Sequence, residues 1–340
     1  MKVNVGDQLL DMRAVWIEGN AVKYIDQSQL PHNVVINEAR TSAEIANAIL
    51  TMKVRGAPSL GAFAAMGLAI ALKNGEELNS AYNAIRNTRP TANDLFFGLD
   101  VVKNTYESGG DVNPIESANH FVDKLVEQVK KIGEYGEPLI KDGYTILTHC
   151  NAGALATVDW GTAISPIRAA VKKGKKVFVY VDETRPMLQG ARLTSWELKQ
   201  EGIDHAIIAD NAAGLLMYSK KIDMVIVGAD RIAANGDFAN KIGTYEKAVL
   251  AKENGIPFYV AAPFSTFDKK IMSGNRIPIE ERPPEEVLNF GNCRTAPEGV
   301  KAYNPAFDVT SSRYVTGYIT PMGVYTPNLL FLVFSKVLPR

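Results

Sequence analysis

Residues 144–181 read YTILTHCNAGALATVDWGTAISPIRAAVKKGKKVFVYV, and this stretch decides the fold. Two short runs rich in apolar and β-branched residues, 144–149 and 177–181, flank a longer run, 154–173, whose pattern is typical of a helix. A strand, a helix and a second strand at this spacing are typical of a βαβ crossover in a parallel sheet.

The same alternation continues towards the C-terminus. Further strands are predicted at 206–209, 224–227 and 258–261, and further helices at 188–200, 212–220 and 245–254. Glycines stand where three of the predicted helices should end, as is common at helix C-termini: Gly174, Gly202 and Gly255. The pattern therefore predicts a Rossmann-like parallel-sheet domain, which we place at residues 126–340.

The first part of the chain has a different pattern. Gly19-Asn20 separates two alternating runs, as in a β-hairpin, and Thr41-Ser42-Ala43-Glu44 resembles a capping box that opens a helix. Helices are predicted at 41–52, 60–73, 92–108 and 114–132. We therefore expect an α/β protein whose residues 1–125 form a mostly helical domain with a small β element.

Composition excludes several classes of function. With 37 basic and 37 acidic residues among 340, the net charge is zero, which argues against a nucleic-acid or membrane partner. Two cysteines and four scattered histidines predict neither a disulfide framework nor a metal site. The start lacks the apolar core of a signal peptide, and the longest apolar run, 60–72, is too short to span a bilayer. We expect a soluble, cytoplasmic protein with free thiols.

The residues that follow the predicted strands indicate a site. Cys150, Asp182, Asp210 and Asp230 each come at or just after the end of a strand. Because ligands of open parallel sheets bind beyond the carboxyl ends of the strands, these groups are expected to form a site there. For Asp210 an alternative is that the carboxylate only caps the next helix.

Two of these groups favour acid–base chemistry. Cys150 lies between a strand and a helix start, where the helix dipole favours a thiolate. A dyad with His149 is not expected, because neighbouring strand residues point to opposite faces. Asp230 follows an apolar strand, and desolvation there would raise the pKa of its carboxyl group. Cys293 has no such context and is interpreted as incidental.

Basic residues beside predicted helix starts suggest that an anionic group is bound. Arg55 precedes Gly56 and Ala57 just before the buried helix, and Arg89 stands at the start of another. Lys241 would add a third charge. The sequence contains no G-x-G-x-x-G, P-loop or G-x-S-x-G motif, so a dinucleotide enzyme, a nucleoside-triphosphatase and an α/β-hydrolase are not supported.

These motifs together carry a family resemblance. They are RGA (55–57), RPTA (89–92), THCNAG (148–153), ETRPMLQGARLT (183–194), GADR (228–231), NKIGT (240–244) and NPAFDVT (304–310). From about residue 14 to residue 324 the chain resembles the 5-methylthioribose-1-phosphate isomerase family, enzymes of methionine salvage that are homologous to the regulatory subunits of the translation factor eIF2B.

The resemblance implies an aldose–ketose isomerisation, needed for methionine biosynthesis, of a sugar that carries phosphate on C1. It implies Cys150 and Asp230 as catalytic groups, with Asp230 as proton donor. It implies that the substrate is bound by Arg55, Gly56, Ala57, Arg89, Gln189, Asn240 and Lys241. It also implies a homodimer and no metal or other cofactor. Whether hydrogen moves from C2 to C1 as a proton or as a hydride is left open by the sequence.

Two other functions fit the same motifs. A ribose-1,5-bisphosphate isomerase would need room and charge for a second phosphate, where a methylthio group needs an apolar pocket. A non-catalytic, eIF2B-like regulatory subunit would use the same fold for binding alone. The presence of both Cys150 and Asp230 together with the phosphate-binding positions disfavours the regulatory subunit, which has no need of them together.

Overall fold

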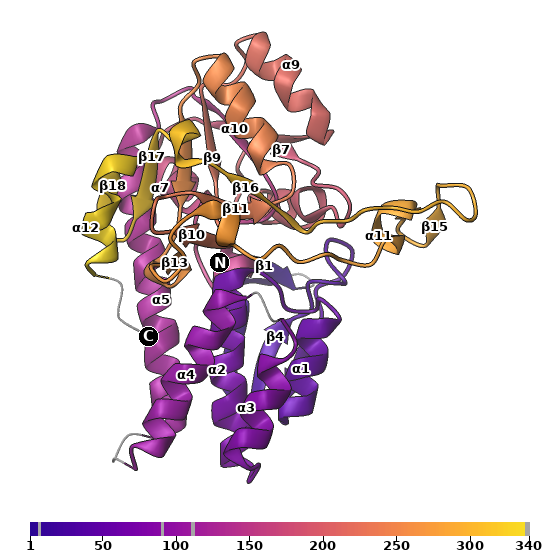
Figure 1. The fold of residues 1–340 in the computed structure, drawn as a ribbon, viewed down its shortest axis with the longest axis vertical. Coiled ribbons are helices and arrows are strands. Elements are labelled where there is room, and N and C mark those ends of the chain that lie inside the picture. Colours follow the sequence, from indigo (N-terminus) through magenta and orange to yellow (C-terminus); the bar gives the residue numbers. More distant parts are fainter. Residues whose placement is uncertain (6–7, 90–91, 110–112, 337–340) are drawn as a thin grey trace.

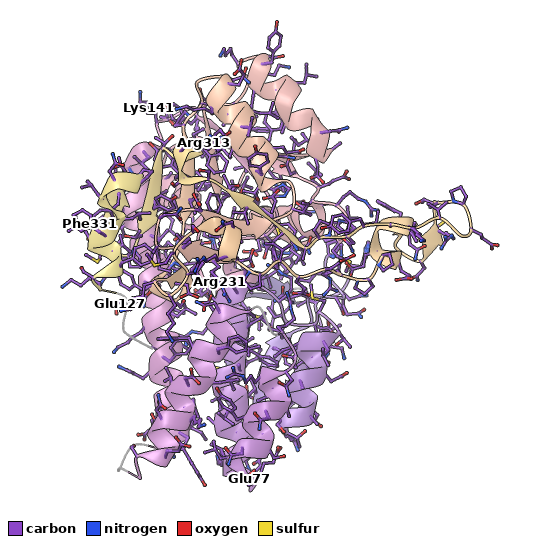
Figure 2. The ribbon with its side chains drawn as sticks, in the orientation of Figure 1. Glu77, Glu127, Lys141, Arg231, Arg313 and Phe331 are labelled. Carbon is purple, nitrogen blue, oxygen red and sulfur yellow. The ribbon has the colours of Figure 1, made fainter. Side chains whose placement is uncertain are left out.

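The computed structural model describes residues 1–5, 8–89, 92–109 and 113–336. The chain forms a mixed α/β protein in which a layer of helices from the N-terminal third meets a mainly parallel sheet (Figure 1). Glu77 lies at the lower tip of the helical part, and Lys141 lies on the opposite side of the molecule, beyond the sheet (Figure 2). The predicted fold class is confirmed.

Five helices build the N-terminal part: α1 (Ser42–Leu50), α2 (Ala57–Lys73), α3 (Leu78–Arg86), α4 (Asn93–Glu107) and α5 (Pro114–Gly136). The predicted capping box is present at α1, where the Thr41 side chain accepts the Glu44 N–H and the Glu44 side chain accepts the Thr41 N–H. α2 is the centre of this layer, because every residue from Ala57 to Ala71 is buried. This explains why the sequence of α2 is apolar on all sides.

Two small β elements accompany these helices. The predicted hairpin around Gly19 is confirmed and continues into a three-stranded antiparallel sheet of β3 (Val15–Glu18), β4 (Ala21–Ile25) and β5 (Ile36–Ala39). A further hairpin, β1 (Lys2–Val5) with β2 (Gln8–Asp11), was not predicted. All four residues of β2 are exposed, so its sequence has no alternation of apolar and polar residues that would reveal it.

The main sheet has seven strands in the order β18-β17-β12-β9-β6-β7-β8. Their bounds are β6 (Thr145–Thr148), β7 (Phe178–Asp182), β8 (His205–Ile208), β9 (Met224–Val227), β12 (Phe258–Ala261), β17 (Gly317–Thr320) and β18 (Gly323–Tyr325). All neighbours are parallel except β17 and β18. The five predicted strands are confirmed, and the parallel arrangement brings their carboxyl ends to one edge.

The helices of the sheet part are α6 (Ala154–Thr157), α7 (Ile164–Lys172), a π-helix (Gly190–Thr194) that continues into α8 (Ser195–Gln200), α9 (Ala213–Tyr218), α10 (Thr244–Glu253), α11 (Glu285–Leu288) and α12 (Leu330–Phe334). Gly174, Gly202 and Gly255 follow helix ends with φ of 86°, 68° and 70°, as predicted. Only glycine takes up this left-handed region at low cost.

The prediction of one helix over 154–173 was wrong. α6 ends at Thr157, and α7 begins only at Ile164. Between them Val158 and Trp160 have φ of 74° and 63°, which no α-helix allows. The Thr157 hydroxyl accepts the Gly161 N–H at 3.0 Å and stabilises this turn. A local side-chain contact of this kind leaves no mark on the apolar periodicity.

A second sheet follows Asp230. It has the order β13-β10-β11-β16, with β10 (Arg231–Ala233), β11 (Phe238–Lys241), β13 (Phe267–Asp268) and β16 (Phe307–Thr310). The segment 280–304 leaves the body as an arm that carries α11, β14 (Asn289–Phe290) and β15 (Cys293–Arg294) (Figure 1). Short 3-10 helices cover Glu137–Leu139, Asp210–Ala212, Phe264–Thr266, Gly274–Arg276, Ser312–Tyr314 and Pro327–Leu329.

α5 connects the two parts. It packs against α2 and α4 on one side and against α7 and β17 on the other. The predicted division after residue 125 falls inside this helix, and the division remains a prediction. None of the helices in the described ranges combines the length and the apolar character needed to cross a membrane.

The crossing of α2 and α4 gives a stability prediction. A Cβ atom on Gly98 would lie 2.1 Å from the backbone oxygen of Gly61, so the two helices touch through their backbones. We expect Gly98→Ala to lower the free energy of unfolding by roughly 1–3 kcal/mol, because the helices must move apart. Denaturant unfolding measures this change.

The matched control is Gly214→Ala in α9. There a Cβ atom would meet only the Leu250 side chain, at 3.3 Å, and alanine favours a helix by roughly 0.5–1 kcal/mol over glycine. Equal stability of the two variants would contradict the close helix crossing.

Candidate active site

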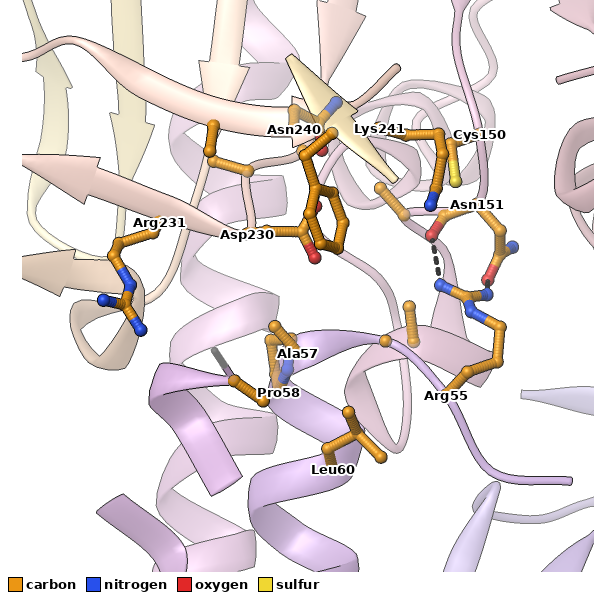
Figure 3. A pocket seen from close by; sticks show the side chains of 18 of the residues that line it. Arg55, Ala57, Pro58, Leu60, Cys150, Asn151, Asp230, Arg231, Asn240 and Lys241 are labelled. Carbon is orange, nitrogen blue, oxygen red and sulfur yellow. Dashed lines mark hydrogen bonds between the residues drawn. The ribbon is translucent and has the colours of Figure 1, made fainter. Parts of the chain in front are cut away.

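One cavity lies between the N-terminus of α2 and the carboxyl ends of β6 and β9 (Figure 3). It encloses about 980 Å³ of space between atoms, open solvent at its mouth included. All nine predicted site residues line it: Arg55, Gly56, Ala57, Arg89, Cys150, Gln189, Asp230, Asn240 and Lys241.

Cys150 is held in the cavity wall by its backbone. It follows β6 with a φ of 63°, and its side chain is buried. Its N–H donates to the Thr184 hydroxyl at 2.9 Å, and its C=O accepts from the Thr194 hydroxyl at 2.6 Å. These two threonines belong to the 183–194 motif, so that motif fixes the position of the thiol.

The surroundings of Cys150 oppose the thiolate that its place in the sequence favours. Burial raises the pKa of the thiol, and the nearby charges of Arg55 and Lys241 only partly oppose this effect. The helix whose dipole was expected to favour a thiolate does not begin directly after Cys150. It begins at Ala154 and is only four residues long. Cys150 is therefore a thiol near neutral pH.

Asp230 has the perturbed carboxyl group that its position predicts. Burial raises its pKa, while the charges of Lys241, Arg55 and Arg89 lower it by less. The Asp230 N–H donates to the carbonyl of Ala239 in β11 at 2.9 Å, so the pairing of β10 with β11 sets its position. Figure 3 shows the carboxyl group directed into the cavity, with Arg231 on the side of Asp230 opposite Cys150. A buried carboxyl group of this kind can hold and release a proton.

Arg55 and Gly56 join the helical layer to the sheet. Arg55 donates from Nη1 to Asn151 Oδ1 at 2.6 Å and from Nη2 to the Asn151 carbonyl at 3.0 Å. Gly56 has a φ of 94°, and a Cβ atom there would lie 2.6 Å from Ala156. The glycine therefore lets the start of α2 approach α6 closely, and it leaves the N-terminus of α2 facing the cavity.

Arg89 contacts a carboxylate. Its Nε and Nη2 donate to Glu280 Oε2 at 3.1 and 2.9 Å. Nε and Nη2 donate from one edge of the guanidinium, so most of the hydrogen-bonding capacity of Nη1 is left for other partners. Two residues of the predicted 89–92 motif, Pro90 and Thr91, lie outside the described residues.

Lys241 and Asn240 come from the end of β11. Lys241 Nζ donates to the Ala306 carbonyl at 3.0 Å and lies 4.6 Å from the centre of the Phe307 ring. Burial lowers the pKa of Lys241, and the neighbouring Cys150 and Asp230 oppose this shift. Asn240 Nδ2 donates to the Thr244 hydroxyl at 2.9 Å.

Gln189 has an unused polar atom. Its side chain is 4% exposed, and its Oε1 has no hydrogen-bond partner among the described residues. A buried acceptor without a donor costs roughly 1–3 kcal/mol. A hydroxyl-bearing ligand in the cavity would supply the missing donor.

Two strand-end carboxylates do not reach the cavity. Asp182 pairs with His149, and Asp210 accepts the N–H groups of Thr184 and Arg185 at 2.7 Å. The expectation that all four strand-end groups form the site was therefore wrong for these two. The alternative for Asp210, that its carboxylate caps the next helix, is also wrong. Its oxygens instead accept hydrogen bonds from Thr184 and Arg185 in the loop after β7.

The other predictions around Cys150 agree with the structure. His149 lines the cavity, but its ring nitrogens contact Asp182 and the Ile242 carbonyl rather than the thiol. Cys293 is exposed on the arm and does not line the cavity.

Sequence reasoning missed Glu197. This buried carboxylate accepts the Asn151 side chain at 2.8 Å and the Ala154 and Leu155 N–H groups at 2.6 and 3.2 Å. A Cβ atom on Gly153 would clash with it at 2.3 Å. Glu197 lies in α8. The only feature of the sequence that could have indicated its role is its position three residues after the 183–194 motif.

One group of side chains has metal-ligand geometry. Ligand atoms of His149, Asp182 and Asp210 lie within 4.8 Å of one another. Each already contacts protein groups, since His149 and Asp182 pair together and Asp210 accepts two backbone N–H groups. Hydrogen bonds to protein therefore account for this group, and the predicted lack of a metal remains a prediction.

The chain is similar to known proteins over most of its length. Residues 53–327 match the model of the initiation factor 2 subunit family. Methylthioribose-1-phosphate isomerase 1 of Pseudothermotoga lettingae is 51% identical over 323 residues, which cover 91% of this chain and 93% of the relative.

Two solved structures share the fold. The crystal structure of 5-methylthioribose 1-phosphate isomerase from Pyrococcus horikoshii has a TM-score of 0.88 and 45% identity, and covers 95% of this chain and 96% of its own. The structure of the translation initiation factor eIF-2B, subunit delta, from A. fulgidus has a TM-score of 0.82 and 42% identity, and covers 96% and 99%.

The raised thiol pKa gives a test of the site. In a Cys293→Ser protein, alkylation by iodoacetamide reports Cys150 alone. Because only the thiolate reacts, we expect the rate to rise with pH to a midpoint above that of a cysteine in a short peptide. Lys241→Met should move the midpoint higher still, because it removes a charge that favours the thiolate.

Mass spectrometry of the labelled protein measures these rates. The same protein unfolded in urea is the control, and there the midpoint should return to the peptide value. A midpoint below the peptide value in the folded protein would show that the site favours a thiolate.

Proposed function

The chain belongs to the initiation factor 2 subunit family, and we propose that it is an isomerase of that family, which converts 5-methylthioribose 1-phosphate to 5-methylthioribulose 1-phosphate. This aldose–ketose isomerisation is a step of methionine salvage. The observation that carries the proposal is the meeting of a buried thiol, Cys150, and a half-buried carboxyl group, Asp230, in one cavity that four arginine and lysine side chains also line.

The basic groups are suited to hold the phosphate of the substrate. Arg55 and Lys241 lie on the Cys150 side of the cavity, and the N-terminus of α2 faces it (Figure 3). Guanidinium and ammonium groups beside a helix N-terminus bind a phosphate dianion well. Arg89 adds a guanidinium that Glu280 orients. Gln189 and Asn240 would contact the sugar hydroxyl groups.

The reaction needs two proton transfers. The cyclic 1-phosphate has no free aldehyde, so the ring must open first, and the Asp230 carboxyl group gives its proton to the ring oxygen as the C1–O bond breaks. A hydrogen then moves from C2 to C1, and the C2 hydroxyl gives its proton to the carboxylate that ring opening left on Asp230, as the ketone forms. Cys150, in the same cavity, is the second group placed to exchange protons with the sugar.

The overall balance of protons and electrons is the same whether the hydrogen moves from C2 to C1 as a hydride or as a proton. No electrons leave the sugar, so the scheme uses no redox cofactor.

The cavity has an apolar side that favours a methylthio group. Leu60 lies below Asp230 in Figure 3, and Ile277 and Phe307 also line the wall. Arg231 also lines the cavity, but it lies 3.7 Å from Asp268 in an ion pair. A second phosphate, as in ribose 1,5-bisphosphate, would have to lie against this apolar surface.

A regulatory subunit without catalysis is the alternative from another class, and the relative from A. fulgidus is named as a translation initiation factor subunit. Such a subunit gains nothing from burying a thiol and a carboxyl group beside the phosphate site, because each costs desolvation energy. The site therefore supports catalysis.

We also propose that the enzyme works in the cytoplasm as a homodimer. Support comes from the family resemblance, from two free thiols, and from apolar side chains exposed on the arm, among them Phe290 and Tyr303. Sedimentation of the purified protein would determine the mass.

An activity assay tests the proposed function. The purified protein should isomerise 5-methylthioribose 1-phosphate and should turn over ribose 1,5-bisphosphate far more slowly, with or without added AMP. Cys150→Ala and Asp230→Asn should each lower kcat by roughly 10²–10⁴-fold, because each removes a proton-transfer group. Cys293→Ala is the matched control and should keep full activity.

Three outcomes would overturn this reading. Preference for ribose 1,5-bisphosphate would assign the rival isomerase. Binding of the substrate without turnover would favour a regulatory subunit. A folded Cys293→Ala enzyme as impaired as Cys150→Ala would remove the thiol assignment.

Arg89 provides a separate test of phosphate binding. Losing one charge-assisted contact costs about 1.5–3 kcal/mol, so Arg89→Ala should raise KM roughly ten- to 150-fold. We expect kcat to fall as well, because Arg89 joins the helical layer to Glu280 beyond the sheet. Sulfate should raise the melting temperature of the wild type more than that of the variant.

The control is Arg313→Ala, an exposed arginine outside the cavity (Figure 2). If Arg89→Ala matches the control in KM, kcat and the sulfate effect, Arg89 does not bind phosphate.

A further inference from the structure

His149 is a buried histidine whose ring nitrogens both contact protein groups. Nδ1 lies 2.7 Å from Asp182 Oδ2, and Nε2 lies 2.8 Å from the Ile242 carbonyl oxygen. The side chain is 1% exposed, and that of Asp182 is fully buried. The chemistry proposed above gives His149 no role, although it is the neighbour of Cys150.

The contact to Ile242 has a defined direction. A carbonyl oxygen can only accept a hydrogen bond, so Nε2 carries a proton and donates it. Nδ1 and Asp182 then share one further proton between them. Lys247, also fully buried, places Nζ 3.6 Å from the same Asp182 oxygen and pairs with Glu246. The ring is thus fixed on the carboxyl end of β7.

Ile242 directly follows Asn240 and Lys241, the two site residues at the end of β11. The ring packs against Gly243, where a Cβ atom would lie 3.0 Å from His149 Cε1. Gly243 has a φ of 101° and its N–H donates to Asp308 at 2.7 Å. The segment that carries Lys241 is therefore held by Asp308 on its N–H side and by His149 on its carbonyl side.

The position of Lys241 matters for the chemistry of the site. Its charge favours the ionised forms of both Cys150 and Asp230, and its burial is costly without close partners. A shift of the Ile242 carbonyl would move Lys241 away from these groups and from a bound phosphate.

We propose that His149 is a positioning residue whose Nε2–H holds the Ile242 carbonyl, while Asp182 orients the ring, and that this contact to Ile242, the clamp, keeps Lys241 and Asn240 in the phosphate-binding geometry. This role rests on the function proposed above. His149 connects the ends of β6 and β7 to the segment between β11 and α10. Because His149 is next to Cys150 and Ile242 is next to Lys241, this one set of hydrogen bonds positions both the Cys150 thiol and the Lys241 ammonium group.

Two conservative variants separate the clamp from general packing. The amide nitrogen of asparagine falls near the position of Nδ1, and that of glutamine falls near Nε2. His149→Asn therefore keeps the contact to Asp182 and loses the one to Ile242, whereas His149→Gln does the reverse. Each variant loses one buried hydrogen bond, so both should melt at a lower temperature than the wild type.

The two variants should differ in phosphate binding. We expect His149→Asn to raise KM, and the Kd for inorganic phosphate measured by calorimetry, by about tenfold, and His149→Gln to raise them by at most about threefold. His205→Asn is the matched control, because His205 also contacts a carbonyl and a side chain, Ile203 and Ser195, outside the cavity. It should leave KM unchanged.

Equal rises of KM in the asparagine and glutamine variants, or no rise in the asparagine variant, would overturn the clamp. If His149→Asn does not fold, the glutamine variant decides alone, and a tenfold loss of phosphate affinity in it overturns the proposal. A wild type that binds phosphate but does not isomerise the substrate would overturn the proposed function, and the phosphate Kd values would still test the clamp.

Discussion

The site depends on one buried chain of hydrogen bonds, which runs from Arg55 through Asn151 to Glu197. Arg55 comes from the helical layer, Asn151 from the end of β6, and Glu197 from α8, so three distant segments meet in one contact series. Burial raises the pKa of Glu197, and the charge of Arg168 and the N–H donors oppose this shift. Removing any member would leave a buried polar group without its partner, which costs roughly 1–3 kcal/mol. The position of Cys150, next to Asn151, follows from this chain.

Much of the fold could be predicted from local patterns. The strand at 224–227 and the capping box at Thr41 are local, because apolar runs and short-range hydrogen bonds determine them. The break after Thr157 could not be predicted, because a side-chain contact to Gly161 decides it. The site shows the same division. The position of Asp230 follows from its strand end, but the role of Asp182 depends on a contact to His149 that no spacing reveals.

Solved structures with this fold are named as an isomerase and as a translation initiation factor subunit, so the function rests on the cavity. In the proposed function, phosphate binding alone would account for Arg55 and Lys241 in either case. The thiol and the carboxyl group are different, because burial raises the pKa of both and so opposes their ionisation. Proton-carrying groups beside a phosphate site are what ring opening of a sugar 1-phosphate requires. The apolar wall near Leu60 then favours an uncharged substituent on C5.

The most direct measurement is a crystal structure of the Asp230→Asn protein with 5-methylthioribose 1-phosphate bound. The account predicts the phosphate within hydrogen-bond distance of Arg55, Lys241 and the N-terminus of α2. It also predicts the ring oxygen beside residue 230 and the methylthio group against Leu60. A sugar phosphate bound outside this cavity, or a phosphate against the apolar wall, would contradict the account.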